Sequence, residues 1–161
     1  MKLFDYTVEV TTGPEAAFQV VADPRSKLLW VPGIRRVEVS SDVPPGPGMR
    51  YLASSGIWPL EFVFQEQIVG WAENERVTYE GRSPWGHFKT CVVLESKQGG
   101  TRLHYRMDYA FPAGWLGALV GHAIAWVIRQ PMEARAVRRL KEVVEQRLWQ
   151  PEGKYRSLQN L

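Results

Sequence analysis

Tyrosines are the side chains whose type and spacing could carry chemistry in this chain of 161 residues. Alternation along the predicted strands places five of the six on one face of a sheet. These five are Tyr6, Tyr51, Tyr79, Tyr105 and Tyr109. A phenol has a flat apolar ring and one hydrogen-bonding hydroxyl, which suits a ligand that is mostly hydrocarbon with a few oxygens. The same tyrosines could equally be core residues whose hydroxyls bond to backbone carbonyls, and the sequence leaves both interpretations open.

Proton transfer would require a His, a carboxylate or an activated Tyr aimed at the bound molecule. The candidates for that role are Tyr51, Tyr79, Tyr105 and His122. His122 stands alone in an apolar stretch, where a histidine is more often a core or rim residue than a catalyst. Alternation points no carboxylate securely inward, and Glu66 is ambiguous because its long strand has room for a bulge.

The cysteine and histidine content excludes disulfide and zinc chemistry of the usual kinds. Cys91 is the only cysteine, so the chain forms no internal disulfide and no Cys-rich zinc site. The three histidines lack the spacing of a metal site, and we predict neither a metal nor a cofactor. Lys2 and Asp5 interrupt the start of the chain, where a signal peptide would be apolar. We therefore expect a cytoplasmic location.

The net charge of +3 is concentrated at the C-terminal end of the chain. Residues 129–161 contain eight basic and four acidic side chains, and no nucleic-acid-binding motif accompanies them. A solvated helix face explains this pattern better than a binding surface. We expect no nucleic-acid partner.

Hydrophobic periodicity and turn signals divide the chain into three helices and seven strands. The predicted strands span 3–11, 34–41, 48–55, 60–70, 75–82, 87–96 and 101–111. The predicted helices span 15–22, 25–29 and 114–148. Pro131 should kink the last of these helices.

Short connections between the strands predict antiparallel hairpins, and hence an α+β fold. We expect a seven-stranded antiparallel sheet that curls around a long C-terminal helix, with two short helices between the first and second strands. Such a sheet is too wide for side chains to fill all the space beneath it, so a cavity should result. Residues 1–148 would form this single domain, and 149–161 a C-terminal tail.

Several local patterns carry a family resemblance. They are GPEAAF at 13–18 after the opening strand, WVP at 30–32 before VEV at 37–39, and EARAVRRLKE at 133–142. Together with the element order they resemble the START-like (SRPBCC) superfamily, in its polyketide cyclase/dehydrase and coenzyme Q-binding branch. The resemblance implies a helix-grip fold. Members range from lipid carriers and hormone receptors to cyclases, so the fold alone assigns no function.

Strand alternation and the expected fold select the residues that would line the cavity. The expected ligand-contacting residues are Tyr6, Val8, Tyr51, Phe62, Phe64, Tyr79, Phe88, Thr90, Val92, Tyr105, Met107, Tyr109, Leu119, His122, Ala123 and Trp126. The aromatic residues expected at the cavity mouth are Trp30, Trp58, Trp85, Phe111 and Trp115. Large aromatic residues are unusual in turns. They could form a hydrophobic gate, touch a membrane, or fold back to plug the end of the core.

Three functions remain in competition at this level. The first is binding, and transport, of a hydrophobic small molecule such as a lipid, an isoprenoid quinone or a polyketide. The second is a polyketide cyclase/aromatase or dehydratase that uses the cavity Tyr and His residues. The third is a peripheral membrane or partner-binding module, with transient membrane contact. The uncharged run 109–128 fits a packed helix better than a membrane span, because it begins in a strand and contains Pro and Gly. Its glycines and the tail make a homodimer plausible.

Overall fold

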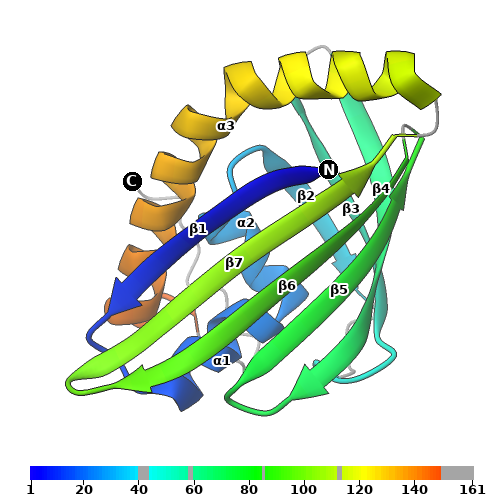
Figure 1. Ribbon diagram of the computed structural model, residues 1–161. Coiled ribbons are helices and arrows are strands. Elements are labelled where there is room, and N and C mark those ends of the chain that lie inside the picture. Colours follow the sequence, from blue (N-terminus) through cyan, green and yellow to red (C-terminus); the bar gives the residue numbers. More distant parts are fainter. Residues whose placement is uncertain (40–43, 58–59, 85, 112–113, 150–161) are drawn as a thin grey trace.

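One antiparallel sheet of seven strands forms the body of the protein (Figure 1). The computed structural model describes residues 1–39, 44–57, 60–84, 86–111 and 114–149. The strands are β1 (Lys2–Val10), β2 (Ile34–Val39), β3 (Arg50–Ile57), β4 (Leu60–Ala72), β5 (Arg76–Ser83), β6 (Gly86–Lys97) and β7 (Gly100–Ala110). Their spatial order is β1-β7-β6-β5-β4-β3-β2, so consecutive strands from β2 to β7 are neighbours and β1 lies beside β7.

Two short α-helices connect β1 to β2, as predicted, with a 3₁₀ turn between them. The first helix, α1 (Pro14–Ala22), begins with a proline, whose fixed backbone angle suits the first helical position. A 3₁₀ turn, η1 (Pro24–Ser26), and the single-turn helix α2 (Lys27–Trp30) follow. The Asp23 carboxylate accepts a hydrogen bond from the backbone N–H of Arg25 at 3.0 Å and so caps the 3₁₀ turn. These segments lie behind β6 and β7 in Figure 1, on the inner side of the sheet.

The long helix α3 (Gly114–Glu145) crosses one end of the sheet and then runs beside β1 (Figure 1). It changes direction between its yellow and orange parts, the region that contains Pro131, which agrees with the predicted kink. The helix ends three residues earlier than predicted. Arg147 adopts a left-handed conformation (φ 51°), and the N–H of Leu148 donates to the Val143 carbonyl at 3.1 Å. Among the described residues, no helix combines the length and apolarity that crossing a bilayer requires.

Two carboxylates fasten the second half of α3 to the free edge of β1. Glu133 Oε1 accepts the backbone N–H of Asp5 at 3.0 Å, and Glu145 Oε1 accepts that of Thr11 at 2.9 Å. An edge strand has backbone N–H groups without a strand partner. The two glutamates supply the missing acceptors and fix the position of the helix.

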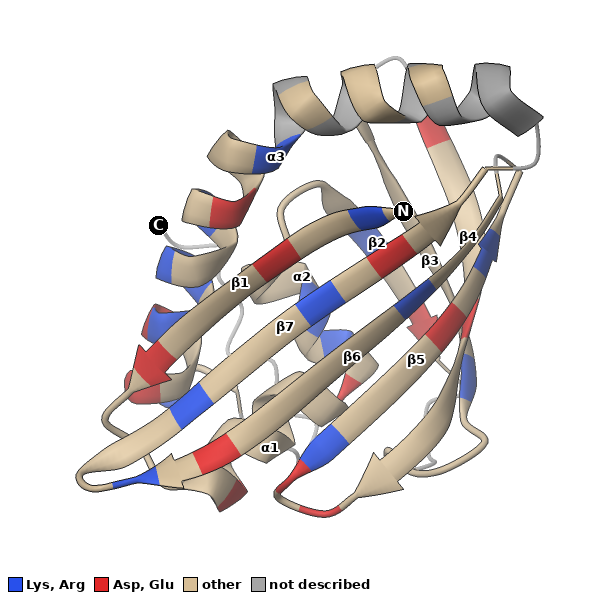
Figure 2. Cartoon of the chain, in the orientation of Figure 1, with Lys and Arg blue, Asp and Glu red and all other residues tan. Residues whose placement is uncertain are grey.

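The two faces of the sheet differ in chemistry. The inner face carries the buried core, in which alternate residues of each strand pack against α1, α2 and α3. The outer face carries charged side chains of both signs, seen as alternating blue and red bands in Figure 2. Many of them form cross-strand ion pairs, such as Lys89–Glu80 at 2.9 Å and Arg102–Glu9 at 2.7 Å. The predicted helix-grip architecture is therefore confirmed.

Candidate functional site

A buried cluster of polar side chains lies where α2 meets the inner face of β3 and β4. The ammonium group of Lys27 donates to the hydroxyl of Tyr51 at 2.5 Å and to Glu66 Oε2. The hydroxyl of Tyr51 in turn donates to the same carboxylate oxygen. All three side chains are buried. A buried charge is tolerated only when it is paired and hydrogen-bonded, and this arrangement meets both conditions.

The ring of Tyr79 completes the surroundings of Lys27. The ammonium nitrogen lies 4.1 Å from the centre of this ring, a cation–π contact. Burial lowers the pKa of Lys27, and the neighbouring carboxylate of Glu66 opposes this shift. Burial, reinforced by the Glu66 charge, raises the pKa of both Tyr51 and Tyr79. Both phenols are therefore neutral hydrogen-bond donors at physiological pH.

The hydroxyl groups of the expected catalytic tyrosines already have partners. Tyr79 donates to the backbone carbonyl of Val21 at 2.6 Å, which ties β5 to the end of α1. Tyr51 donates to Glu66. Burial raises the pKa of Tyr105, whose hydroxyl lies 4.0 Å from the sulfur of Met107. Tyr79 is therefore a core tyrosine whose hydroxyl donates its hydrogen bond to a backbone carbonyl.

Trp30 is a core residue and does not lie at the mouth. Its side chain is only 1% exposed, and its ring meets that of Tyr105 edge-on at 5.9 Å. The indole N–H donates to the hydroxyl of Ser26 at 3.1 Å. Because this partner lies one turn earlier in the chain, the indole turns inward beneath the sheet. The expectation that Trp30 forms part of the rim is therefore wrong.

A ladder of aromatic rings extends across the inner face, beside the polar cluster. Neighbouring ring centres are 6.4 Å apart for Phe62–Phe64, 5.5 Å for Phe64–Phe88, 6.1 Å for Phe88–Tyr109 and 4.5 Å for Tyr109–Phe111. We call these five residues the aromatic ladder. Spacings of 4.5–7 Å are those of interacting rings, so the ladder is a continuous apolar wall.

Gly81 allows the ladder to be continuous. The rungs Phe64 and Phe88 belong to β4 and β6, and Gly81 lies on β5 between these strands. A Cβ atom at Gly81 would lie 2.1 Å from the Phe88 ring. The absence of a side chain there lets the ring of Phe88 lie over β5 and reach Phe64.

The ladder becomes more exposed and acquires a polar group toward its ends. Phe62 is 38% exposed, although it lies on the inner face of β4 with buried Phe64. The hydroxyls of Tyr109 and Ser83 lie 2.5 Å apart. The remaining expected lining residues on strands also lie on the inner face: Tyr6, Val8, Thr90, Val92 and Met107. Their contact with a ligand stays a prediction.

The helical residues expected to line the cavity lie on the opposite face of α3. Leu119 is 63% exposed and Trp126 84% exposed, and His122 and Ala123 are exposed with them. These four positions form one helical stripe, and that stripe faces solvent. The expectation that they face the sheet is therefore wrong. The run 109–128 carries no charge, so its hydrophobic pattern could not show which side the sheet covers.

For three of the expected mouth residues, the structure does not describe the position of the side chain. Trp58 and Trp85 lie outside the described residues, as does the side chain of Trp115. The described ends of the strands on either side of Trp58 and Trp85 lie at the same end of the sheet as partly buried Phe111. A gate at that end stays a prediction.

Sequence reasoning missed the polar cluster, although half of its signal was present. Uninterrupted alternation from Phe62 and Phe64 continues to Glu66 and Ile68, and the bulge in this strand comes later, between Ile68 and Gly70. The alternation along this strand therefore predicts that the side chain of Glu66 faces the inner side of the sheet. The burial of Lys27 could not be predicted, because a helix of four residues is too short for its hydrophobic periodicity to show which face is buried.

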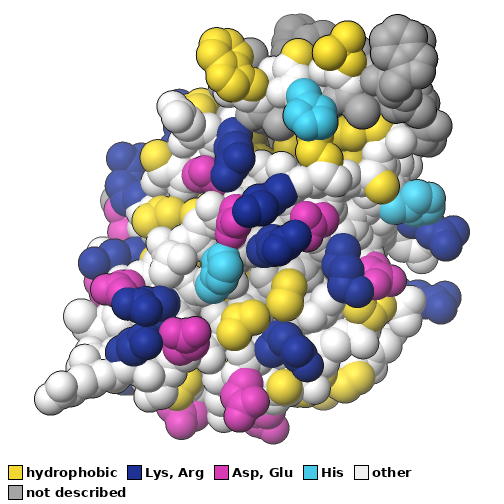
Figure 3. Space-filling view, in the orientation of Figure 1, with side chains coloured by type: hydrophobic (Ala, Val, Ile, Leu, Met, Phe, Trp, Pro, Cys, Tyr) yellow, Lys and Arg dark blue, Asp and Glu magenta, His cyan; other side chains and the backbone are white. Residues whose placement is uncertain are grey.

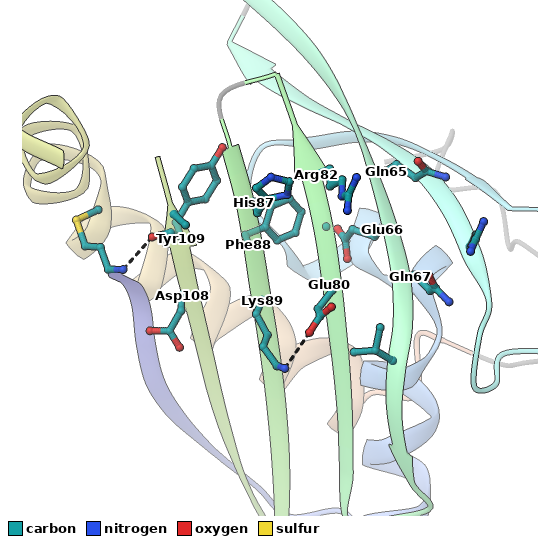
Figure 4. A pocket seen from close by; sticks show the side chains of 15 residues that line it. Gln65, Glu66, Gln67, Glu80, Arg82, His87, Phe88, Lys89, Asp108 and Tyr109 are labelled. Carbon is teal, nitrogen blue, oxygen red and sulfur yellow. Dashed lines mark hydrogen bonds and ion pairs between the residues drawn. The ribbon is translucent and has the colours of Figure 1, made fainter. Parts of the chain in front are cut away.

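A hollow of about 680 Å³ lies on the outer face of the sheet (Figure 4). Its walls are two rows of outward side chains: Gln65, Arg82 and His87 in one, and Gln67, Glu80, Lys89 and Asp108 in the other. The row between them, which includes Glu66, Gly81 and Phe88, turns its side chains inward and supplies the floor. This hollow is separate from the apolar cavity expected beneath the sheet.

The described residues offer no donor set for a metal ion, because no three His, Cys, Asp or Glu side chains gather among them. That the protein works without a metal or cofactor stays a prediction.

Comparison with known proteins places this geometry among helix-grip proteins. A family model described as polyketide cyclase/dehydrase and lipid transport matches residues 1–145. The search of curated proteins found no match.

Several solved structures share the fold. The Zhui aromatase/cyclase from Streptomyces sp. R1128 is similar with a TM-score of 0.71 and 13% identity, over 93% of this chain and 97% of that one. The protein TTHA0849 from Thermus thermophilus has a TM-score of 0.68 and 14% identity, over 88% and 95%. The protein CV1439 from Chromobacterium violaceum has a TM-score of 0.63 and 17% identity, over 88% of this chain and 96% of that one. At these identities the likeness shows the fold alone.

Proposed function

Because the chain belongs to the polyketide cyclase/dehydrase and lipid transport family, we propose that it binds and carries a hydrophobic small molecule between the sheet and α3. Lipids, isoprenoid quinones and polyketides are the ligand classes that fit. The family's description supports a hydrophobic ligand in general, and the choice among these classes depends on the site.

The aromatic ladder is the observation that carries this proposal. It is an apolar wall on the inner face, and at Phe62 the wall is still partly exposed. Burying apolar surface against such a wall contributes about 25 cal/mol per Å², before the cost of ordering the ligand is deducted. Tyr109 and Ser83 add a hydroxyl pair beside the rings, which suits a ligand with a few oxygens.

Binding is better supported than cyclase/aromatase or dehydratase catalysis. A catalytic acid or base must reach the reacting atoms. The hydroxyl of Tyr79 is used by the Val21 carbonyl, and His122 lies on the exposed face of α3. The cluster around Tyr51 and the hydroxyl of Tyr105 are the remaining groups that could handle a proton, so a reaction would have to take place at one of them.

The first test of the proposal is whether a ligand copurifies with the protein. Native mass spectrometry of protein purified gently from its own host should show a copurifying mass in the lipid, quinone or polyketide range. A mass of the bare chain, together with no binding of any apolar probe, would contradict the proposal.

A pair of variants tests the location of the site. Phe62→Ser removes an inner-face ring that is 38% exposed, whereas Leu52→Ser removes an apolar side chain that is 43% exposed on the outer face of β3. We expect the apolar dye N-phenyl-1-naphthylamine to bind the first variant about tenfold more weakly, because a lost ring contact costs about 1.5 kcal/mol. The second should differ from the wild type by less than about twofold. Equal effects in a fluorescence titration would place the site elsewhere.

A further inference from the structure

Glu66 lies beside the middle of the aromatic ladder, two positions along β4 from Phe64. Residues Tyr51, Glu66, Gly81, Phe88 and Tyr109 are register partners in one row across five neighbouring strands, β3 to β7. Because Gly81 has no side chain, the ring of Phe88 extends over it toward Glu66. Figure 4 shows Phe88 between Tyr109 and Glu66. A ligand that lies along the rings would therefore meet a carboxylate beside Phe88.

The two oxygens of this carboxylate differ in their hydrogen bonds. Oε2 accepts from both Lys27 and Tyr51. Among the described residues, no donor is bonded to Oε1. Glu66 is only 3% exposed, and a buried carboxylate gains stability from each further donor that it accepts. Oε1 is thus an acceptor that a ligand can use.

Most donors of the cluster are already in use. Two of the three N–H groups of Lys27 donate to Tyr51 and Glu66, its ammonium nitrogen lies over the Tyr79 ring, and Tyr51 gives its one proton to Glu66. Oε1 itself can only accept, so a ligand group that binds to it must be a hydrogen-bond donor. A carbonyl or carboxylate oxygen placed there would meet the charged Glu66 oxygen with no hydrogen between them.

We propose that the ligand is an apolar, ring-bearing molecule that carries a hydroxyl group, which donates to Glu66 Oε1. This inference rests on the proposed function and narrows its ligand class to phenols, enols and alcohols. It excludes fatty acids bound with their carboxylate at Glu66. The rings of the ligand lie along the ladder, and its polar contact is to the carboxylate.

Two matched probes test the hydroxyl requirement on the full chain. 2-Naphthol carries the donor, and 2-methoxynaphthalene has the same rings without it. Isothermal titration should show that the wild type binds 2-naphthol about tenfold or more tightly than the ether, because a hydrogen bond to a charged acceptor is worth that ratio. Naphthalene-2-carboxylate should bind more weakly than either. If the wild type does not prefer 2-naphthol, the inference fails.

Variants assign the preference to Glu66. Glu66→Gln should reduce the preference for 2-naphthol to less than about threefold, because the acceptor loses its charge. The control Glu80→Gln, which removes an exposed carboxylate on the outer face of β5, should keep the full preference. If Glu66→Gln leaves Lys27 unpaired and does not fold, the double variant Lys27→Met/Glu66→Gln, which buries no charge, replaces it.

The outcomes separate this inference from the proposed function. Binding of both naphthalenes without a preference, or with a preference that survives Glu66→Gln, overturns the inference and leaves hydrophobic binding intact. Failure of both probes and of N-phenyl-1-naphthylamine to bind overturns both.

Discussion

At the residue scale, the ion pair between Lys27 and Glu66 is the most consequential feature. Removing two charges from water is costly, and a pair of apolar residues would pack there at lower cost. Lys27 has two further partners besides Glu66: it donates a hydrogen bond to Tyr51 and makes a cation–π contact with the ring of Tyr79. Such a feature contributes little to stability for its cost. The ligand contact proposed above would give this pair a role in recognition.

Gly81 yields the first prediction at this scale. Gly81→Ala places a methyl group 2.1 Å from the ring of Phe88, so the ring must move. We expect the free energy of unfolding, measured in urea, to fall by about 1–3 kcal/mol. The control is Gly46→Ala, whose added Cβ would meet nothing nearer than 4.0 Å and should change stability by less than about 0.5 kcal/mol. Equal losses in both variants would show that the ladder does not depend on Gly81.

At the element scale, α3 consists of two parts with different attachments. After Pro131 it is fastened to the edge of β1 by Glu133 and Glu145, and Leu140, Val143 and Val144 are buried. Before Pro131 its described exposed stripe includes Leu119 and Trp126. Pro131 separates the two parts, since proline cannot donate the backbone hydrogen bond that would continue the helix. The attached part positions the first part over the end of the sheet.

The two carboxylate contacts predict a site-specific loss of protection. Glu133→Ala removes the acceptor for the Asp5 amide, and Glu145→Ala removes that for the Thr11 amide. Each variant should speed hydrogen exchange at its own amide by about two- to tenfold, as expected for one hydrogen bond, and leave the other unchanged. Hydrogen-exchange NMR measures both amides in both variants, so each variant serves as the control for the other. Acceleration at both amides in both variants would mean that the strand edge opens as a unit.

At the scale of the whole molecule, the first half of α3 carries the most exposed apolar side chains. Charged side chains cover much of the outer face of the sheet, with exposed Leu52, Val63 and Val69 among them, and exposed apolar side chains also gather over α3 at the top of the view (Figure 3). Trp126 is 84% exposed and Leu119 63% exposed. Exposed large apolar residues that share one helix face indicate a contact surface.

Transient membrane contact is the prediction that this helix surface supports. The wild type should cosediment with phosphatidylglycerol vesicles, and Trp126→Gln should reduce the bound fraction by at least about fivefold, because an inserted indole is lost. Leu52→Gln, on the outer face of β3, is the control and should bind as the wild type does. Raising the salt concentration separates the two contributions, since only charge-driven binding weakens with salt. Vesicle binding that is indifferent to Trp126 would contradict a role for this helix face.

Local patterns in the sequence determined the fold and the facing of the strands. Side chains on a strand alternate with a period of two, so a run such as Phe88, Thr90 and Val92 shows its buried face without any knowledge of its neighbours. Turn residues mark the strand ends in the same local way. For this reason the order of elements, the antiparallel pairing and the inner face of the sheet were predictable.

The tertiary structure decided everything that depends on which distant groups meet. Lys27 and Glu66 are 39 positions apart, and a helix of one turn gives no sign of the carboxylate that it will face. Trp30 lies inward because Ser26 and Tyr105 hold it there. The covered side of α3 is set by where the sheet lies, because the run 109–128 is uncharged and offers apolar residues in every direction. Burial is a property of the assembled chain, and a local pattern predicts it only where one face alone is apolar.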